Sequence, residues 1–169
     1  MMAPLAKVFG AIGAILVTVM LIGLVLPGTW SAEASIQIEA SPAEVFPYLN
    51  DLGRWDRWTN WGEIDSELSS PSQSAGASRT WDDPDLGTGS VTITESGSPT
   101  FVRYVVEVEG GASVLGELTI EAVGATSRVT WREEGDFGRN PLMGFVARGM
   151  PESQGAQLAE GLEKLSYIF

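Results

Sequence analysis

The sequence predicts an α+β domain in which a curved antiparallel sheet wraps around a long C-terminal helix, preceded by one N-terminal transmembrane helix. Three patterns carry this prediction. An uncharged apolar run occupies residues 8–26, apolar and polar residues alternate through the middle of the chain, and apolar residues recur at helical spacing near the C-terminus. Because each strand hides one face, the sheet needs a cover, and the C-terminal helix is the only long element available to provide it.

The apolar run of residues 8–26 has the form of a membrane anchor. It contains no charged residue and spans roughly 28 Å as a helix, which matches the hydrocarbon thickness of a bilayer. Lys7 precedes the run and the first charges after it are acidic, so the positive-inside rule places the N-terminus in the cytoplasm and the domain outside. Pro27 and Gly28 end the helix, and Trp30 falls where an interfacial aromatic residue would lie.

A cleaved signal peptide is the alternative interpretation of this segment. Ala32-Glu33-Ala34 has the A-x-A form of a cleavage site. The apolar run is longer than the usual hydrophobic region of a signal peptide, which favours a retained anchor. We therefore expect a single-pass membrane protein with an anchor in residues 1–30 and a domain in residues 34–169, and secretion after cleavage as the alternative. Either way, the domain is exported.

The domain opens with a strand and two short helices. Residues 35–40 alternate between apolar and polar, which predicts the first strand. Ser41 then caps a helix that begins at Pro42, and Glu44, three residues after the cap, completes a capping box. Residues 54–61 follow as a second short helical segment that carries three of the six tryptophans.

Further strands and a long helix complete the predicted domain. Alternation predicts strands at residues 76–83, 89–95, 101–109, 113–122 and 127–134. Short turn clusters join these segments, so the strands should pair as an antiparallel meander. Apolar residues at helical spacing then run from Met143 to Leu165, and Pro151 within this run predicts one kinked helix or two consecutive ones.

Composition and charge exclude several classes of function. Acidic residues outnumber basic ones 22 to 10 and no run of Lys or Arg occurs, which argues against nucleic acid as a partner. The absence of Cys and His excludes thiol nucleophiles, cysteine-based zinc sites and Ser-His-Asp catalysis within this chain. The acidic cluster Asp82, Asp83 and Asp85 lacks the Gly turn and distal Glu of a calcium loop. We expect no metal and no cofactor, and the sequence assigns no catalytic residue.

Several motifs follow one another in an order known from one superfamily. The domain opens with the segment SIQIEASPAEVFPYLNDLGRWDRWTNW. Four further motifs follow it: GAS at 76–78, GTGSVTITES at 87–96, SRVTW at 127–131 and EGLEKL at 160–165. In order and spacing these segments resemble the START-like helix-grip superfamily (SRPBCC), in its polyketide cyclase/dehydrase-related branch. The resemblance covers the chain from residue 34 to residue 168. It implies a helix-grip fold with a cavity, but no transferable catalytic motif.

The resemblance implies a hydrophobic small molecule or lipid held between the sheet and the C-terminal helix. Large aromatic and apolar residues with inward parity are the candidates for the lining of this cavity, and ordinary core packing is the alternative for each of them. The candidate ligand-binding residues are Trp58, Trp61, Arg79, Trp81, Val91, Tyr104, Leu118, Trp131, Met143 and Val146.

Two charged residues share the inward parity of the aromatic candidates. Arg79 stands where similar members often carry an aromatic residue, so it would put a charge at or near the cavity. Glu133 has the same parity as Trp131. Buried together, Arg79 and Glu133 would form an ion pair or bind a polar ligand head. The interpretation favoured by sequence is that both lie at strand ends in solvent.

Three functions from different classes remain open at this point. The preferred one is a binding module for a hydrophobic small molecule, close to the membrane to which the domain is tied. The second is an enzyme, a metal-free cyclase or dehydratase, which requires a buried carboxylate with a raised pKa in the cavity. The third is a protein-interaction module, which a contiguous exposed apolar patch would support. The sequence names no protein partner.

Overall fold

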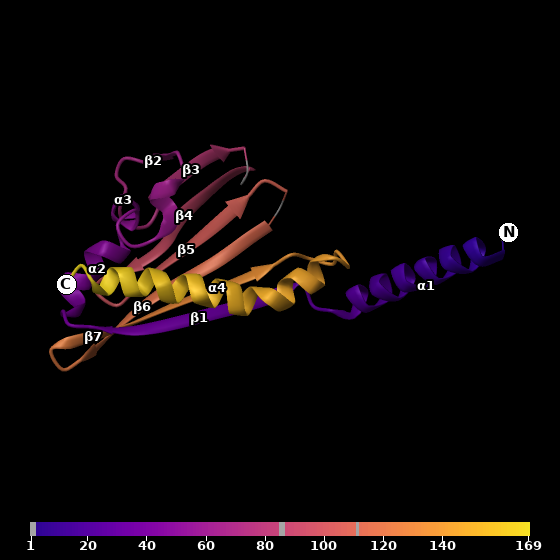
Figure 1. Ribbon diagram of the computed structural model, residues 1–169. Helices are drawn as coiled ribbons and strands as arrows, with labels where there is room; N and C mark the ends of the chain where they lie inside the picture. The colour runs from indigo at the N-terminus through magenta and orange to yellow at the C-terminus, as the bar shows by residue number, and fades with distance from the viewer. Residues whose placement is uncertain (1–2, 85–86, 111) are drawn as a thin grey trace.

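The computed structural model describes residues 3–84, 87–110 and 112–169 (Figure 1). In chain order the elements are α1 (Ala3–Val25), β1 (Thr29–Ile38), α2 (Pro42–Leu49), α3 (Leu52–Trp55), the 3-10 helix η1 (Asn60–Glu63), β2 (Ser66–Leu68), β3 (Ser78–Asp83), β4 (Gly87–Gly97), β5 (Phe101–Val108), β6 (Ala112–Val123), β7 (Thr126–Asp136) and α4 (Met143–Ser166). The strands form one antiparallel sheet in the order β1-β7-β6-β5-β4-β3-β2. Asp85 of the acidic cluster lies outside the described residues.

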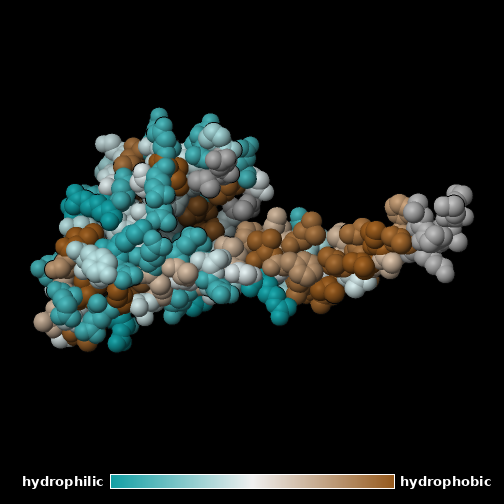
Figure 2. All heavy atoms as spheres, viewed as in Figure 1, coloured by the Kyte–Doolittle hydropathy of each residue, from teal (hydrophilic) through white to brown (hydrophobic). Residues whose placement is uncertain are grey.

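The arrangement of these elements is the predicted helix-grip fold of the α+β class. Figure 1 shows α4, in yellow, lying across one face of the curved sheet, while α1 projects away from the domain. The segment Val8–Val25 of α1 is long and apolar enough to cross a membrane, a form that membrane anchors and signal sequences share. Figure 2 shows this helix as a hydrophobic rod beside a largely hydrophilic domain surface.

Strand β1 begins closer to α1 than the sequence predicts. It starts at Thr29 rather than at residue 35, and its whole length pairs with β7. Trp30, expected at the membrane interface, is instead buried in the domain, with its ring centroid 6.4 Å from that of Phe137. This part of the strand is hard to detect because its other inward residues, Ala32 and the half-buried Ala34, are too small to give a strong alternating signal.

The short helices after β1 follow their capping signals. Ser41 and Glu44 form the predicted capping box, in which the Ser41 backbone N–H donates to Glu44 Oε2 at 2.9 Å. The helical segment predicted over residues 54–61 is divided between α3 and η1. Asp51 and Thr59 each accept a hydrogen bond from the backbone N–H two residues later, so two separate caps start two separate turns.

The strands after η1 form the predicted antiparallel meander, with β2 as an additional edge strand that has no sequence signal. Their register aligns the inward residues across the sheet. Trp131 of β7 lies opposite Leu118 of β6, and Tyr104 of β5 lies opposite Gly116. Because residues of one parity share one face of a strand, the sheet presents these aromatic side chains to α4.

Helix α4 is a single helix of 24 residues that continues through Pro151, so the alternative of two consecutive helices is wrong. Its buried apolar stripe consists of Leu158, Leu162 and Leu165, as the spacing predicts. The helix lies mainly along β1, at one edge of the sheet. The middle strands are therefore not covered by the helix backbone, and a space remains between α4 and the segment that contains η1.

Candidate functional site

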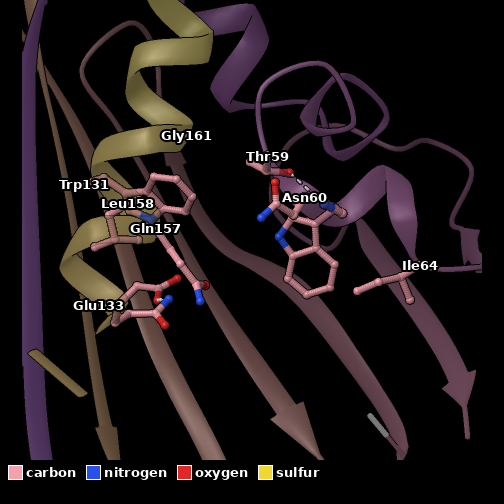
Figure 3. Close-up of a pocket in the computed structure, with 10 residues that line it drawn as sticks. Thr59, Asn60, Ile64, Trp131, Glu133, Gln157, Leu158 and Gly161 are labelled. Carbon is pink, nitrogen blue, oxygen red and sulfur yellow. Dashed lines mark hydrogen bonds between the residues drawn. The ribbon is translucent and has the colours of Figure 1, made fainter. Parts of the chain in front are cut away.

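A cavity of about 210 Å³ lies between α4, η1 and β7, on the face of the sheet that α4 crosses. Figure 3 shows the side chains from α4 and β7 on one side of it and those of the η1 segment on the other. Its lining residues are Thr59, Asn60, Trp61, Ile64, Trp131, Glu133, Gln154, Gln157, Leu158 and Gly161. The lining therefore combines aromatic and aliphatic surface with a group of hydroxyl, amide and carboxyl side chains.

One face of α4 forms the first wall of the cavity. Its lining residues recur at the i, i+3, i+4 and i+7 positions of a helix, which places them on one side: Gln154, Gln157, Leu158 and Gly161. Gly161 allows the helix to approach the sheet closely, because a Cβ added there would lie 2.8 Å from the Trp131 ring. In Figure 3 the Gln157 side chain extends from α4 toward the open space.

Buried Arg79 holds the opposite wall in place. Its guanidinium donates to the carbonyl oxygen of Trp61 at 3.1 Å and to that of Leu52 at 3.0 Å. It also pairs with Asp56 at 2.6 Å, and the Asp56 side chain is 44% exposed. From β3, Arg79 thus ties α3 and η1 to the sheet. It positions the wall behind Trp61 and is not among the residues that line the cavity.

Glu133 occupies the polar end of the cavity within a chain of hydrogen bonds. The Tyr104 hydroxyl donates to Glu133 Oε1, and Trp131 Nε1 donates to the Tyr104 hydroxyl at 2.7 Å. From α4, Gln154 Nε2 donates to Glu133 Oε2 at 2.7 Å. Only 6% of Glu133 is exposed. The network therefore joins β5, β7 and α4 around one buried carboxyl.

The environment of this carboxyl changes its acid–base behaviour. Burial raises the pKa of Glu133, although the hydrogen bonds from Tyr104 and Gln154 act in the opposite direction. Burial also raises the pKa of Tyr104 well above its usual value, and the nearby Glu133 charge adds to that effect. A carboxyl that keeps its proton at higher pH can donate as well as accept a hydrogen bond, and it is a candidate acid–base group.

The structure corrects the expectation that Arg79 and Glu133 lie in solvent at strand ends, because both are buried. They also do not pair with each other. Arg79 binds Asp56, whereas Glu133 binds Tyr104 and Gln154. The reason is the strand order: β3 and β7 are separated by β4, β5 and β6, which puts them about 19 Å apart along the sheet at the usual strand spacing.

Among the predicted aromatic residues, Trp61 and Trp131 line the cavity and others support them from behind. The fully buried Trp58 packs edge-on against Trp131, with ring centroids 5.2 Å apart. Trp81 packs edge-on against Trp61, with centroids 5.1 Å apart, and its indole N–H has no hydrogen-bond partner among the described residues. Each of the two cavity tryptophans is thus packed against an aromatic neighbour.

The remaining predicted cavity residues lie elsewhere. Three are enclosed in the core, each 2% exposed or less: Val91, Tyr104 and Leu118. Met143 and Val146 do not line this cavity, because their side chains are 37% and 47% exposed at the start of α4. There the buried positions are taken by Gly144 and Ala147. Helical spacing identified a face of the helix but not which face meets the sheet.

Several lining residues were not predicted from the sequence. Gln154 and Gln157 share a helical face with Leu158, so their spacing was a signal that could have identified them. Trp61 of the η1 segment was predicted, but Thr59, Asn60 and Ile64 have no such signal, because this short segment has no sustained periodicity. Within the described parts of the chain, no three acidic side chains gather closely enough to hold a metal ion.

Solved structures of low sequence identity share this fold. CalU16 from Micromonospora echinospora superposes with a TM-score of 0.58 at 17% identity, covering 82% of this chain and 73% of that one. Mll3558 from Rhizobium loti gives a TM-score of 0.59 at 16% identity, covering 83% and 97%. DynU16, a protein of the dynemicin biosynthetic locus, gives 0.58 at 15% identity, covering 81% of this chain, which spans only 46% of DynU16. At these identities the similarity shows the fold alone.

The sequence also matches a protein family over most of its length, although no curated protein matches it. Residues 29–166 match the family described as polyketide cyclase / dehydrase and lipid transport. The match begins at the first residue of β1 and ends at the last residue of α4, so it covers the whole domain and leaves α1 outside. As the order of its motifs predicts, this chain belongs to the polyketide cyclase/dehydrase and lipid transport family.

Proposed function

We propose that this protein binds a hydrophobic small molecule in the cavity between α4, η1 and β7. The observation that carries the proposal is the composition of the lining. Trp61, Ile64, Trp131 and Leu158 present apolar surface, and Glu133, Gln154 and Gln157 place polar groups on the wall formed by β7 and α4. A largely apolar lining with a few placed polar groups is typical of small-molecule sites. Membership of a family described by lipid transport supports the same proposal.

The size and polarity of the cavity narrow the class of ligand. At about 210 Å³ it is smaller than the roughly 300–1,000 Å³ of most drug-sized sites. It therefore suits a compact apolar molecule, or one end of a longer molecule that extends through the opening. Glu133 and Gln154 offer hydrogen bonds to a hydroxyl or carbonyl group. An anionic group is disfavoured beside Glu133, so we expect an apolar body with one uncharged polar group.

A bulky substitution at the mouth of the cavity tests this proposal. Gln157→Trp places a large ring where the Gln157 side chain borders the open space, and Ala156→Trp adds the same ring at an exposed neighbouring position outside the lining. Small molecules are extracted from each full-length protein, purified from its native membrane, and identified by mass spectrometry. We expect one compound to accompany the wild type and Ala156→Trp but not Gln157→Trp. Equal recovery from both variants, or no compound from any, would contradict the proposal.

We further propose that α1 is a retained membrane anchor, with its N-terminus in the cytoplasm and the domain outside. Cleavage after Ala34 would remove the first part of β1, including Trp30 and Ala32, which are 6% and 4% exposed. Losing the buried Trp30 side chain alone would cost about 3–5 kcal/mol, and the edge of β7 would become unpaired. These losses favour retention. To test retention, membranes are washed at alkaline pH and the intact mass of the protein that stays in them is measured. A mature chain that begins at Ser35 would contradict the proposed anchor.

The raised pKa of buried Glu133 supports a second candidate function, acid–base catalysis of cyclisation or dehydration. Such an enzyme needs a group that gives a proton to a leaving hydroxyl or takes one from an adjacent carbon. Glu133→Gln keeps the shape of the side chain and removes this ability. The compound extracted from the wild type is incubated with both proteins. Loss of water with the wild type only supports catalysis, and unchanged compound with both leaves binding as the function.

A further inference from the structure

The start of α4 carries large apolar side chains on the molecular surface, away from the cavity. Four of them, which we call the α4 patch, are between 37% and 58% exposed: Leu142, Met143, Phe145 and Val146. Three of these fall at the i, i+3 and i+4 positions and so form one stripe on the helix surface. The face of the domain that Figure 2 shows is largely hydrophilic, and neither the cavity nor its support uses the residues of the α4 patch.

The α4 patch lies beside the last turn of the apolar span in α1. A Cβ added to Gly144 would lie 2.7 Å from the Cβ of Leu26, and one added to Gly23 would clash with the carbonyl of Pro141. The two glycines therefore let the start of α4 touch the end of α1. Because the apolar span is Val8–Val25, this contact puts the patch at the level where the span ends.

The charges around the α4 patch suit a bilayer surface. Arg139 and Arg148 flank the patch along the chain, and both are exposed. The protein as a whole carries a net charge of −12, whereas Arg139 and Arg148 are the only charged residues in the sequence between Asp136 and Glu152. Apolar residues next to basic ones are typical of helices that lie in the headgroup region, where the cations meet lipid phosphates.

We propose that the α4 patch inserts into the outer interfacial region of the bilayer that α1 crosses, as a second membrane contact. This inference rests on the proposed role of α1 as a retained anchor. With two contacts, the domain cannot rotate freely about its link to α1. The cavity residues of α4, 154–161, lie roughly 12–23 Å beyond Val146 along the helix. The second contact therefore holds the cavity at a fixed height above the membrane, facing one direction.

Lipid is the occupant that these observations favour over a protein partner. The start of α4 touches the end of the apolar helix α1 through Gly144 and Pro141, and the adjoining part of α1 is exposed, as Leu24 at 63% illustrates. A membrane that surrounds α1 at this level would reach the patch without any further rearrangement. A second copy of the chain or another protein would need a surface that fits both α1 and the start of α4 in order to cover the patch.

Fluorescence quenching at defined depth tests the inference. The chain has no Cys, so single cysteines can be introduced and labelled one at a time. Phe145→Cys and, separately, Val146→Cys report on the α4 patch in full-length protein reconstituted into phosphatidylcholine vesicles that contain a spin-labelled lipid. Leu24→Cys is the control inside α1. Tyr167→Cys, 77% exposed, is the control in water, roughly 32 Å from Val146 by helical rise.

The outcomes separate the inference from the proposed anchor. Quenching at residues 145 and 146 nearly as strong as at residue 24, with little at residue 167, supports insertion. If residue 24 is quenched while 145 and 146 behave like 167, the inference is overturned and the anchor stands. If residue 24 is also unquenched, the anchor fails and the inference fails with it. If residue 145 is not quenched by lipid and unlabelled Phe145→Cys forms a disulfide between two copies when an oxidant is added, the patch is assigned to a protein contact instead.

Discussion

Replacing Glu133 with glutamine probes the buried carboxyl without changing its shape. A glutamine can still accept a hydrogen bond from the Tyr104 hydroxyl through Oε1, and its Nε2 can donate to Gln154 Oε1 once the Gln154 amide turns over. The change removes a titrating group whose pKa is raised by burial. We expect Glu133→Gln to match the stability of the wild type in acid and to exceed it at neutral pH.

The sign and size of this difference follow from proton binding. With the folded pKa raised, the unfolded chain loses its Glu133 proton first as pH rises above the ordinary value of 4.5. The stability that the neutral Glu133 carboxyl contributes is therefore fully present below pH 4.5 and is lost as pH rises through the folded pKa. Each pH unit between the two pKa values costs the wild type about 1.4 kcal/mol and the variant nothing. The difference should grow with pH and then level off, and its plateau measures the shift.

Glu133→Ala is the matched control for the loss of hydrogen bonds. It leaves the Tyr104 hydroxyl, on a residue that is 2% exposed, without an acceptor. An unsatisfied buried donor costs about 1–3 kcal/mol, and the lost methylene adds about 0.8 kcal/mol. We expect this variant to be less stable than the wild type by about 2–4 kcal/mol in acid, where Glu133→Gln matches the wild type.

Urea unfolding of the full-length protein in detergent micelles, followed by tryptophan fluorescence, measures both variants. The free energy of unfolding is compared at several values between about pH 4 and pH 8. A difference between Glu133→Gln and the wild type that does not vary with pH would refute burial as the dominant influence on this carboxyl. If the free energy of unfolding of the wild type rose relative to that of Glu133→Gln with increasing pH, the folded protein would prefer the ionised carboxylate.

The same unfolding assay checks two further predictions, each with its own control. Gly161→Ala should lower stability by about 1 kcal/mol, because overpacking against Trp131 outweighs the helix propensity of alanine. Its control, Gly155→Ala, has no atom within 4 Å of the added Cβ and should raise stability by up to about 1 kcal/mol. Arg79→Met should cost about 2–4 kcal/mol and reduce the recovery of bound ligand, because the buried Leu52 carbonyl and the partly buried Trp61 carbonyl lose a charged donor. The exposed Arg57→Met should change stability by less than about 0.5 kcal/mol. Equal effects within either pair would contradict the corresponding reasoning.

Local patterns were sufficient to predict most elements of the fold. The capping box of Ser41 and Glu44 forms as expected because its partners lie within one turn of the chain. The alternation over residues 101–109 corresponds to β5, since alternation is the direct mark of a strand with one buried face. Strand β2 escaped prediction because three residues are too few to show a period, and it exists because the edge of β3 offers it a partner.

The site was harder to predict than the fold. Strand parity predicts that the Trp131 side chain faces inward, and in the structure it lines the cavity, but parity cannot tell whether a position lies beside a gap or under packed neighbours. Glu133 was expected in solvent because charged residues are rarely buried without a partner. Its partners Tyr104 and Gln154 come from β5 and α4, remote in sequence, and they make its burial tolerable.

By itself, the sequence determined the apolar α1, the alternating strands and the long C-terminal helix, because each depends on the local order of apolar and polar residues. Only the tertiary structure decided where the cavity between α4, η1 and β7 lies. Helix α4 lies along β1, approaches the sheet closely at Gly161, and turns Gln154 toward Glu133. A cavity is the volume that packing leaves unfilled, so it depends on the relative placement of segments far apart in the chain, which no local periodicity encodes.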